Sequence, residues 1–332
     1  MNRPRLVIVT PALRDANNGN WQTAQRWARW LAADYRVRLA AGWDAGDDAL
    51  LIALHARRSA ASVAAWRRQR GTAPVLLVLT GTDLYRDITH DAAAQQSLAW
   101  ADRLVVLNEL GLRSLPPALR GKASVCLQSC PTRQPGPKPQ RHLRALMVGH
   151  LRDEKSPQTY FDAARLLAAR PDIHLDHIGS ALDPALAAQA IALMQTHPRY
   201  RWLGELPHGR TRARIAAAHL LVHPSRMEGG AHVVMEAITC GTPVLASRID
   251  GNLGLLGADY PGVFEPGDAA GLAAALQRAR DDAAMLDALR SAIKKRAPLF
   301  APERERLAVR GLVADLLAAH DATHGTTHGT AV

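Results

Sequence analysis

The chain has 332 residues, a hydrophobic fraction of 48% and a net charge of +11 at pH 7. This composition excludes a disordered or fibrous chain, and the length predicts about two domains at roughly 100–200 residues each. The charge predicts anionic partners, namely nucleic acid, a membrane surface or phosphorylated small molecules. The 36 arginines against 5 lysines also fit a compositional bias.

Short apolar runs alternate with helix-period segments in the first half of the chain. The predicted strands are 5–9, 36–40, 50–54, 74–79 and 103–107. The predicted helices are 20–33, 59–70 and 91–101. This alternation, with strands that are apolar throughout, predicts a doubly wound parallel α/β sheet.

A proline-rich stretch, residues 131–140, predicts a semi-rigid linker, after which the pattern begins again. The strands predicted beyond it are 143–148, 173–178, 200–203, 220–223 and 243–246. The helices predicted there are 156–169, 184–196, 210–217, 231–240, 269–297 and 303–319. We therefore expect two Rossmann-like domains, at 1–130 and 141–297, then a helical segment at 298–320 and a disordered tail at 321–332.

Three cysteines in a chain of this length predict a reducing, cytoplasmic compartment rather than a disulfide framework. Cys126 and Cys130 have no Cys/His pair at zinc-ligand spacing, so no metal site is expected there. The apolar run 6–9 is too short for a signal segment, and no apolar run is long enough to span a membrane.

The most informative stretch, residues 225–244, reads SRMEGGAHVVMEAITCGTPV. Gly229 and Gly230 predict a turn after a strand, a helix starts near Ala231, and Gly241 is the residue that follows its C-cap. Ligands of open α/β sheets bind at the carboxyl ends of the strands, and the free N–H groups at a helix start bind phosphate. The stretch therefore predicts a phosphate-binding turn.

Glu228 and Glu236 flank this turn and would repel a phosphate. We expect them to bind sugar hydroxyl groups instead, because hydroxyl groups donate strong hydrogen bonds to carboxylates. Metal binding by Glu228, His232 and Glu236 is an alternative, but the glycine pair interrupts the helix that would align them. A capped helix with a polar face is a second alternative.

A second motif follows the strand 143–148, where residues 147–155 read MVGHLRDEK. Together the two motifs resemble the donor-binding signature of retaining GT-B glycosyltransferases of family 4. The resemblance covers about residues 1–320. It implies two Rossmann-like domains that face each other across a cleft, with a C-terminal helix that packs back toward the N-terminal domain.

The same resemblance implies roles for individual residues of the donor site. Glu236 would hold the nucleotide ribose, Glu228 would contact the donor sugar, and Lys155 would clamp the diphosphate. The family's arginine position is His150 here and Arg152 lies two residues later, so either one could replace it. We expect catalysis by Lys155, Arg152 and Glu228 without a metal ion or cofactor. The full expected donor-binding set is Asn18, Gly19, Asn20, Gly149, His150, Arg152, Lys155, Glu228, Gly229, Gly230, Ala231 and Glu236.

The N-terminal half carries two weaker motifs. Residues 17–20 read NNGN, where the family has a glycine-rich loop, although a plain βα turn also favours these residues. Residues 79–85 read LTGTDLY and resemble a family stretch in which many members carry a histidine at the position of Thr80. Asp83 would either bind an acceptor or cap the turn. The acceptor candidates are Thr80, Thr82, Asp83, Arg14, Arg86 and Arg226.

The combination of motifs also resembles the selenosugar synthases of selenoneine biosynthesis. It includes the stretches 81–88, 149–153, 200–205, 226–231 and 247–252. This resemblance implies UDP-N-acetylglucosamine as the donor and selenophosphate as the acceptor. An anionic nucleophile of this kind needs no general base, which is compatible with a threonine at position 80.

Two other kinds of function compete with this interpretation. A glycosyltransferase with a lipid, saccharide or small-molecule hydroxyl acceptor would share the donor site, and segment 57–70 is its best candidate for a membrane-surface helix. A nucleic-acid-binding module would need basic residues clustered with aromatics, whereas these arginines are scattered. We expect small-molecule substrates, no nucleic acid and no stable membrane association.

Overall fold

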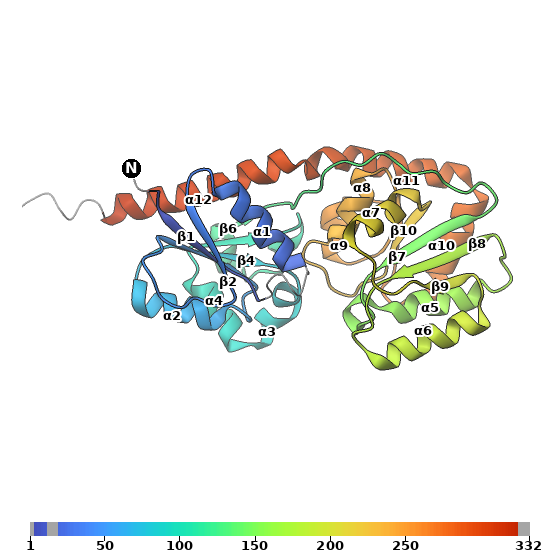
Figure 1. The fold of residues 1–332 in the computed structure, drawn as a ribbon, viewed down its shortest axis with the longest axis horizontal. Coiled ribbons are helices and arrows are strands. Elements are labelled where there is room, and N and C mark those ends of the chain that lie inside the picture. The colour runs from blue at the N-terminus through green and yellow to red at the C-terminus, as the bar shows by residue number, and fades with distance from the viewer. Residues whose placement is uncertain (1–2, 12–18, 325–332) are drawn as a thin grey trace, which may run out of the picture. The chain divides into compact units, whose positions relative to one another are not determined.

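The computed structural model describes residues 3–11 and 19–324, apart from the side chain of His324, and divides the chain into two compact units. Unit 1 combines residues 1–128 with the segment from Pro302 onward, and unit 2 runs from Ser129 to Ala301. Each unit has one parallel six-stranded sheet with helices on it (Figure 1). This is the expected α/β class, with a Rossmann-like parallel sheet in each unit.

The sheet of unit 1 has the order β2-β1-β3-β4-β5-β6. Its strands are β1 (Arg5–Val9), β2 (Arg36–Ala40), β3 (Leu50–Leu54), β4 (Val75–Leu79), β5 (Arg103–Val106) and β6 (Ala123–Val125). Its helices are α1 (Gly19–Leu31), α2 (Ala60–Arg70), α3 (Ile88–His90), α4 (Ala92–Trp100) and α12 (Pro302–His324). Short 3₁₀ turns at Gly111–Ser114 and Pro117–Lys122 precede β6, and β4 is followed by a π-helical turn, η2 (Asp83–Asp87). The sequence pattern missed β6 and η2.

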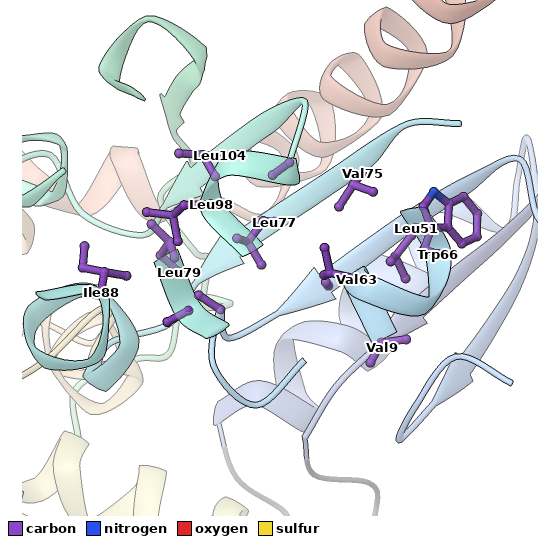
Figure 2. Close-up of a cluster of buried hydrophobic side chains, with 14 of the residues drawn as sticks. Val9, Leu51, Val63, Trp66, Val75, Leu77, Leu79, Ile88, Leu98 and Leu104 are labelled. Carbon is purple, nitrogen blue, oxygen red and sulfur yellow. The ribbon is translucent and has the colours of Figure 1, made fainter. Parts of the chain in front are cut away.

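Both faces of this sheet are buried, because alternate side chains of each strand enter different cores. Val7 and Val9 pack with Trp66 of α2 in one core, which Figure 2 shows. Leu6 and Ile8 lie in the other core. Full burial of a large side chain stabilises the fold by about 2–3 kcal/mol.

The C-terminal helix α12 belongs to unit 1 and covers the second core. Val309 and Val313 of α12 pack there with Trp27 of α1. The buried carboxylate of Glu305 accepts hydrogen bonds from Arg26 at 2.9 and 2.8 Å and from Trp27 Nε1 at 2.7 Å. These contacts confirm the expectation that the C-terminal helix packs on the N-terminal domain.

The sheet of unit 2 has the order β12-β11-β10-β7-β8-β9. Its strands are β7 (Leu143–Val148), β8 (Ile173–Ile178), β9 (Tyr200–Trp202), β10 (Leu220–His223), β11 (Val244–Ser247) and β12 (Val263–Phe264). Its helices are α5 (Pro157–Leu166), α6 (Pro184–Thr196), α7 (His208–Ala217), α8 (His232–Thr239), α9 (Asp250–Leu256), α10 (Ala269–Asp281) and α11 (Ala283–Arg296). Short 3₁₀ turns lie at Asp153–Lys155 and Ala297–Phe300. Helix α9 and strand β12 were not predicted.

Two predicted elements need correction. The long helix expected over 269–297 is two helices, because Asp282 leaves the helical conformation and its carboxylate accepts from Ala284 N at 2.9 Å to cap α11. The tail was expected from residue 321, but α12 continues to His324. The remaining residues of that tail lie outside the described part of the chain.

The proline-rich stretch 131–140 contains neither helix nor strand, and it lies along unit 2. Gly136 N donates to Ala216 O at 2.9 Å, and Lys138 Nζ donates to the same carbonyl at 3.3 Å. Burial lowers the pKa of Lys138 to about 8. These hydrogen bonds hold the stretch against the end of α7.

Candidate active site

The polar side chains of unit 2 that the sequence singled out gather past the carboxyl ends of its strands. Gly149 follows β7, Gly179 follows β8, and the segment with Glu228 follows β10. This edge is where ligands bind in open α/β sheets.

An ion pair between a half-buried lysine and a buried glutamate joins two of these segments. Nζ of Lys155 lies 2.5 Å from Oε1 of Glu228, and Nε2 of His223, the last residue of β10, lies 3.1 Å from the same oxygen. Burial alone would raise the pKa of Glu228, but Lys155 and His223 outweigh it and hold this pKa well below its ordinary value. Glu228 is therefore an anion whose charge is balanced inside the protein.

Two glycines allow backbone segments to meet here. A Cβ on Gly251, at the start of α9, would lie 1.9 Å from the carbonyl oxygen of Glu228. A Cβ on Gly179 would lie 2.0 Å from the carbonyl oxygen of Gly149. Only glycine fits at either position, so the Glu228 and Gly149 segments are held by close backbone packing.

The loop after β7 presents a histidine of defined tautomer. Nδ1 of His150 accepts a hydrogen bond from Ser180 N at 3.1 Å, so the proton of its neutral ring is on Nε2. Burial first, and then the charges of Arg152 and Lys155, lower the pKa of His150. The loop therefore combines a neutral N–H donor with two nearby cations.

The second glutamate of the motif, Glu236, is a buried residue of α8. Its Oε1 lies 2.6 Å from Nε2 of His208, at the start of α7, and 3.8 Å from Nε of Arg212. The hydrogen bond to Glu236 raises the pKa of His208. The His208 side chain is 61% exposed, so a ligand can displace it from Glu236.

The turn that opens α8 has the predicted form. Gly229 and Gly230 precede Ala231, which is the N-cap residue, and no side chain caps the helix. Gly241, with a φ of 73°, follows the C-cap residue as predicted. The N-terminus of α8 therefore presents backbone N–H groups beside Glu228.

Among the predicted residues of unit 1, Gly19 and Asn20 form the first turn of α1. Gly19 O accepts a hydrogen bond from Thr23 Oγ1 at 2.8 Å. The predicted donor residue Asn18 and the predicted acceptor residue Arg14 lie outside the described residues.

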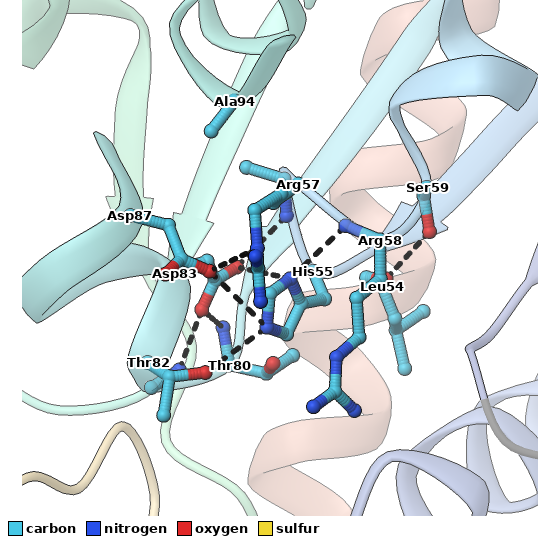
Figure 3. A network of polar contacts seen from close by, with 12 residues as sticks. Leu54, His55, Arg57, Arg58, Ser59, Thr80, Thr82, Asp83, Asp87 and Ala94 are labelled. Carbon is cyan, nitrogen blue, oxygen red and sulfur yellow. Dashed lines mark hydrogen bonds and ion pairs between the residues drawn. The ribbon is translucent and has the colours of Figure 1, made fainter. Parts of the chain in front are cut away.

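The loop after β4 and the first residue of η2 carry three acceptor candidates, shown in Figure 3. Asp83 is buried, and its carboxylate accepts from the N–H groups of Ala56, Thr80 and Gly81 at 2.8–2.9 Å. These are the contacts of a turn-capping residue. Thr80 and Thr82 are half-buried.

The other two acceptor candidates in the described residues are already paired. Nε of Arg86 lies 3.1 Å from Oδ1 of Asp87 in unit 1. Arg226 is in unit 2, where its guanidinium lies 3.2 Å from Asp153 and its backbone N donates to Glu154 O at 2.9 Å. Arg226 therefore ties the Glu228 segment to the turn that ends in Lys155.

Glu228, His232 and Glu236, the metal-site alternative, do not share one helix, because α8 starts at His232. Across residues 3–11 and 19–324, no group of three or more His, Cys, Asp or Glu side chains is arranged to hold a metal ion. Within the same residues, no helix has the length and apolar character needed to cross a membrane.

Sequence reasoning missed two side chains of this site. His223 is the last residue of β10, and its position at a strand end was the signal that could have found it. His208 opens α7 and reaches Glu236 only through the tertiary fold. No local pattern predicts that contact.

The chain is similar to a known protein family and to several solved structures. A family model described as "Glycosyl transferases group 1" matches residues 131–298. Sucrose-phosphate synthase from Thermosynechococcus elongatus is 20% identical, with a TM-score of 0.78 over 96% of this chain and 100% of that one. Anabaena Alr3699/HepE, solved in complex with UDP and glucose, is 14% identical, with a TM-score of 0.72 over 94% and 100%.

A further solved structure is similar over a smaller share of the two chains. The pneumococcal O-GlcNAc transferase GtfA, in complex with UDP and GlcNAc, is 16% identical, with a TM-score of 0.64 over 81% of this chain and 57% of that one. At these identities the likeness establishes a shared fold.

Proposed function

Because the chain belongs to the group 1 glycosyl transferases, we propose that it transfers N-acetylglucosamine from UDP-N-acetylglucosamine to selenophosphate. The donor class follows from the family, and the finer assignment rests on the motifs that resemble selenosugar synthases. The single observation that carries the donor site is the buried contact between Lys155 and Glu228, at 2.5 Å.

In this proposal the diphosphate lies over the loop after β7. Lys155 and Arg152 supply positive charge, and the Nε2–H of His150 donates a hydrogen bond. The N-terminus of α8 adds backbone N–H groups. Negative charge builds on the leaving diphosphate in the transition state, and preorganised cations and N–H donors stabilise it there. The cations are the chain's own, so the proposal includes no metal ion.

The two glutamates hold the rest of the donor. Glu236 accepts hydrogen bonds from the ribose hydroxyl groups, and the exposed His208 side chain, which contacts its Oε1, moves aside. Glu228 accepts from a sugar hydroxyl while Lys155 passes from Glu228 to the phosphate. Both carboxylates then bind hydroxyl groups and are kept away from phosphate charge.

The transfer step exchanges one bond at the anomeric carbon. A selenium lone pair of selenophosphate forms the carbon–selenium bond, while the bond from that carbon to the β-phosphate oxygen breaks. UDP leaves with the bonding electron pair, and the product carries the phosphate on selenium. No proton has to be removed from the nucleophile, and retention of configuration is expected from the family resemblance.

The test is to incubate the protein with a panel of UDP-sugars, with and without selenophosphate, and to measure UDP release and selenium-containing sugar by mass spectrometry. The proposal expects UDP release that depends on selenophosphate. It also expects loss of at least tenfold in turnover for Lys155→Ala and Glu236→Ala, and none for Lys295→Ala, whose lysine is exposed on α11. UDP release without selenophosphate would favour a hydroxyl acceptor and contradict the proposed acceptor.

A further inference from the structure

His55, just past the carboxyl end of β3, has an unusual backbone. Its φ is 75°, in the left-handed region that favours glycine, yet its side chain is buried. A residue other than glycine in this region costs of order 1–3 kcal/mol, and such residues cluster at functional sites. The next strand end along the sheet carries the π-helical turn η2, another feature found at functional sites.

The hydrogen bonds of His55 define its tautomer. Arg58 N donates to Nδ1 at 3.3 Å, so the proton of the neutral ring is on Nε2. Nε2 lies 3.1 Å from Oγ1 of Thr82 and therefore donates to it. Burial lowers the pKa of His55 and so favours the neutral ring, against the opposing effect of Asp83 and Asp87, each 3.9 Å from a ring nitrogen. The Thr82 hydroxyl then accepts from the ring and is left with its own proton to donate to a ligand.

Three arginines surround this pair, and they are not equivalent. Arg57 and Arg86 contact Asp87, at 2.9 and 3.1 Å, and neutralise it. Within the described part of the chain no carboxylate lies within ion-pair distance of the exposed Arg58 guanidinium, and no contact is drawn to it in Figure 3. Arg58 is thus the cation here that is available to a ligand.

The start of α2 adds to the positive character beside Arg58. Ser59, the N-cap residue, donates its hydroxyl to Leu54 O at 2.6 Å and caps none of the helix N–H groups. The first turn of α2 contains no acidic residue to offset the helix dipole. The nearest buried acid, Asp83, is occupied by three backbone N–H groups.

We propose that the Arg58 guanidinium and the Thr82 hydroxyl, the latter oriented by His55, bind a tetrahedral oxyanion of the phosphate class. A guanidinium offers two parallel N–H groups to such an anion, and a hydroxyl donor supplies a third hydrogen bond. The inference rests on the proposed function in one respect, since the phosphate-type acceptor is the substrate that this site would take. It adds Arg58 to the acceptor candidates, of which Arg86 and Arg226 are paired with aspartates.

The test uses inorganic phosphate as the probe, with the full chain and saturating UDP so that a nucleotide-diphosphate site cannot take the phosphate. Calorimetric titration compares the wild type with Arg58→Gln, Thr82→Val and a control, Arg68→Gln, whose arginine is exposed on α2. We expect at least tenfold weaker phosphate binding for Arg58→Gln, a smaller loss for Thr82→Val, and wild-type binding for Arg68→Gln. Thermal unfolding of each variant establishes that the fold is retained.

The outcomes separate this inference from the proposed function. Equal phosphate binding by Arg58→Gln and Arg68→Gln, or no binding by the wild type, overturns the oxyanion site even if selenosugar is formed. Binding that depends on Arg58, in a protein that forms no selenosugar, supports the oxyanion site and contradicts only the proposed acceptor.

Discussion

Nζ of Lys155 lies 2.5 Å from Oε1 of Glu228, and both side chains are largely withdrawn from water. The two residues come from different strand-end loops, so this ion pair joins the loop after β7 to the loop after β10. In the proposed mechanism Lys155 binds phosphate, so it would first have to leave the glutamate that holds it in place.

Replacement of Lys155 by alanine should lower the free energy of unfolding by about 3 kcal/mol, because it leaves the Glu228 carboxylate buried without its main counter-charge. The double variant Lys155→Ala/Glu228→Gln should recover part of this loss, since no buried charge remains. Urea denaturation of both single variants and the double variant measures the coupling. Strict additivity of the two changes would contradict the buried ion pair.

The contact between His208 and Glu236 makes stability depend on pH. The pKa of His208 is raised in the folded protein, so the contact stabilises the fold fully below pH 6.5, the ordinary pKa of histidine. This stabilisation is lost as the pH rises through the pKa that His208 has in the folded protein. The melting temperature of the wild type should therefore fall relative to that of His208→Asn between about pH 6 and pH 9. His90→Asn, at an exposed position of α3, is the control and should follow the wild type. Parallel curves for the wild type and His208→Asn would count against this linkage.

Gly251→Ala should displace the Glu228 segment, because the added Cβ would lie 1.9 Å from a backbone carbonyl oxygen that cannot rotate away. We expect a loss of several kcal/mol in unfolding free energy, or loss of UDP binding if the segment moves instead. Gly311→Ala is the control, since that position in α12 is open and alanine favours a helix by about 1 kcal/mol. Wild-type stability together with wild-type UDP binding in Gly251→Ala would refute the close packing.

Glu305→Ala should destabilise unit 1 by about 3 kcal/mol, because Arg26 and Trp27 would lose the carboxylate that accepts all their hydrogen bonds to α12. Glu303→Ala, two residues earlier, removes only an exposed pair with Arg306 and should cost no more than about 0.5 kcal/mol. Chemical denaturation of the two variants tests the difference. Similar losses in both would mean that Glu305 does not secure the helix.

Much of the fold was predictable, because most of its strands are short runs rich in apolar residues. The five residues Arg5–Val9 and the six residues Leu143–Val148 form strands with the predicted bounds. The break at Asp282 was not predictable in the same way, since the apolar period of α10 continues into α11. The end of α12 was missed because its last turns carry too few apolar residues to show a helical apolar periodicity.

The residues of unit 2 proposed for the donor site could be selected from the sequence as a set, because they lie in two short motifs next to strand ends. Their contacts could not, because pairing of Lys155 with Glu228 or of His208 with Glu236 depends on how distant segments pack. The acceptor candidates Arg86 and Arg226 were selected by charge, and both are paired with aspartates in the structure. The residues now proposed, His55 and Arg58, follow a strand that carries no motif.

Unit 1 is assembled from two segments separated by the whole of unit 2. Its second core lacks Val309, Val313 and Leu316 until the last helix has been synthesised. On the ribosome, the continuous segment Ser129–Ala301 can fold while unit 1 still exposes the apolar surface around Trp27. Translation that stops before α12 would therefore yield a chain with one finished domain and one open, aggregation-prone domain.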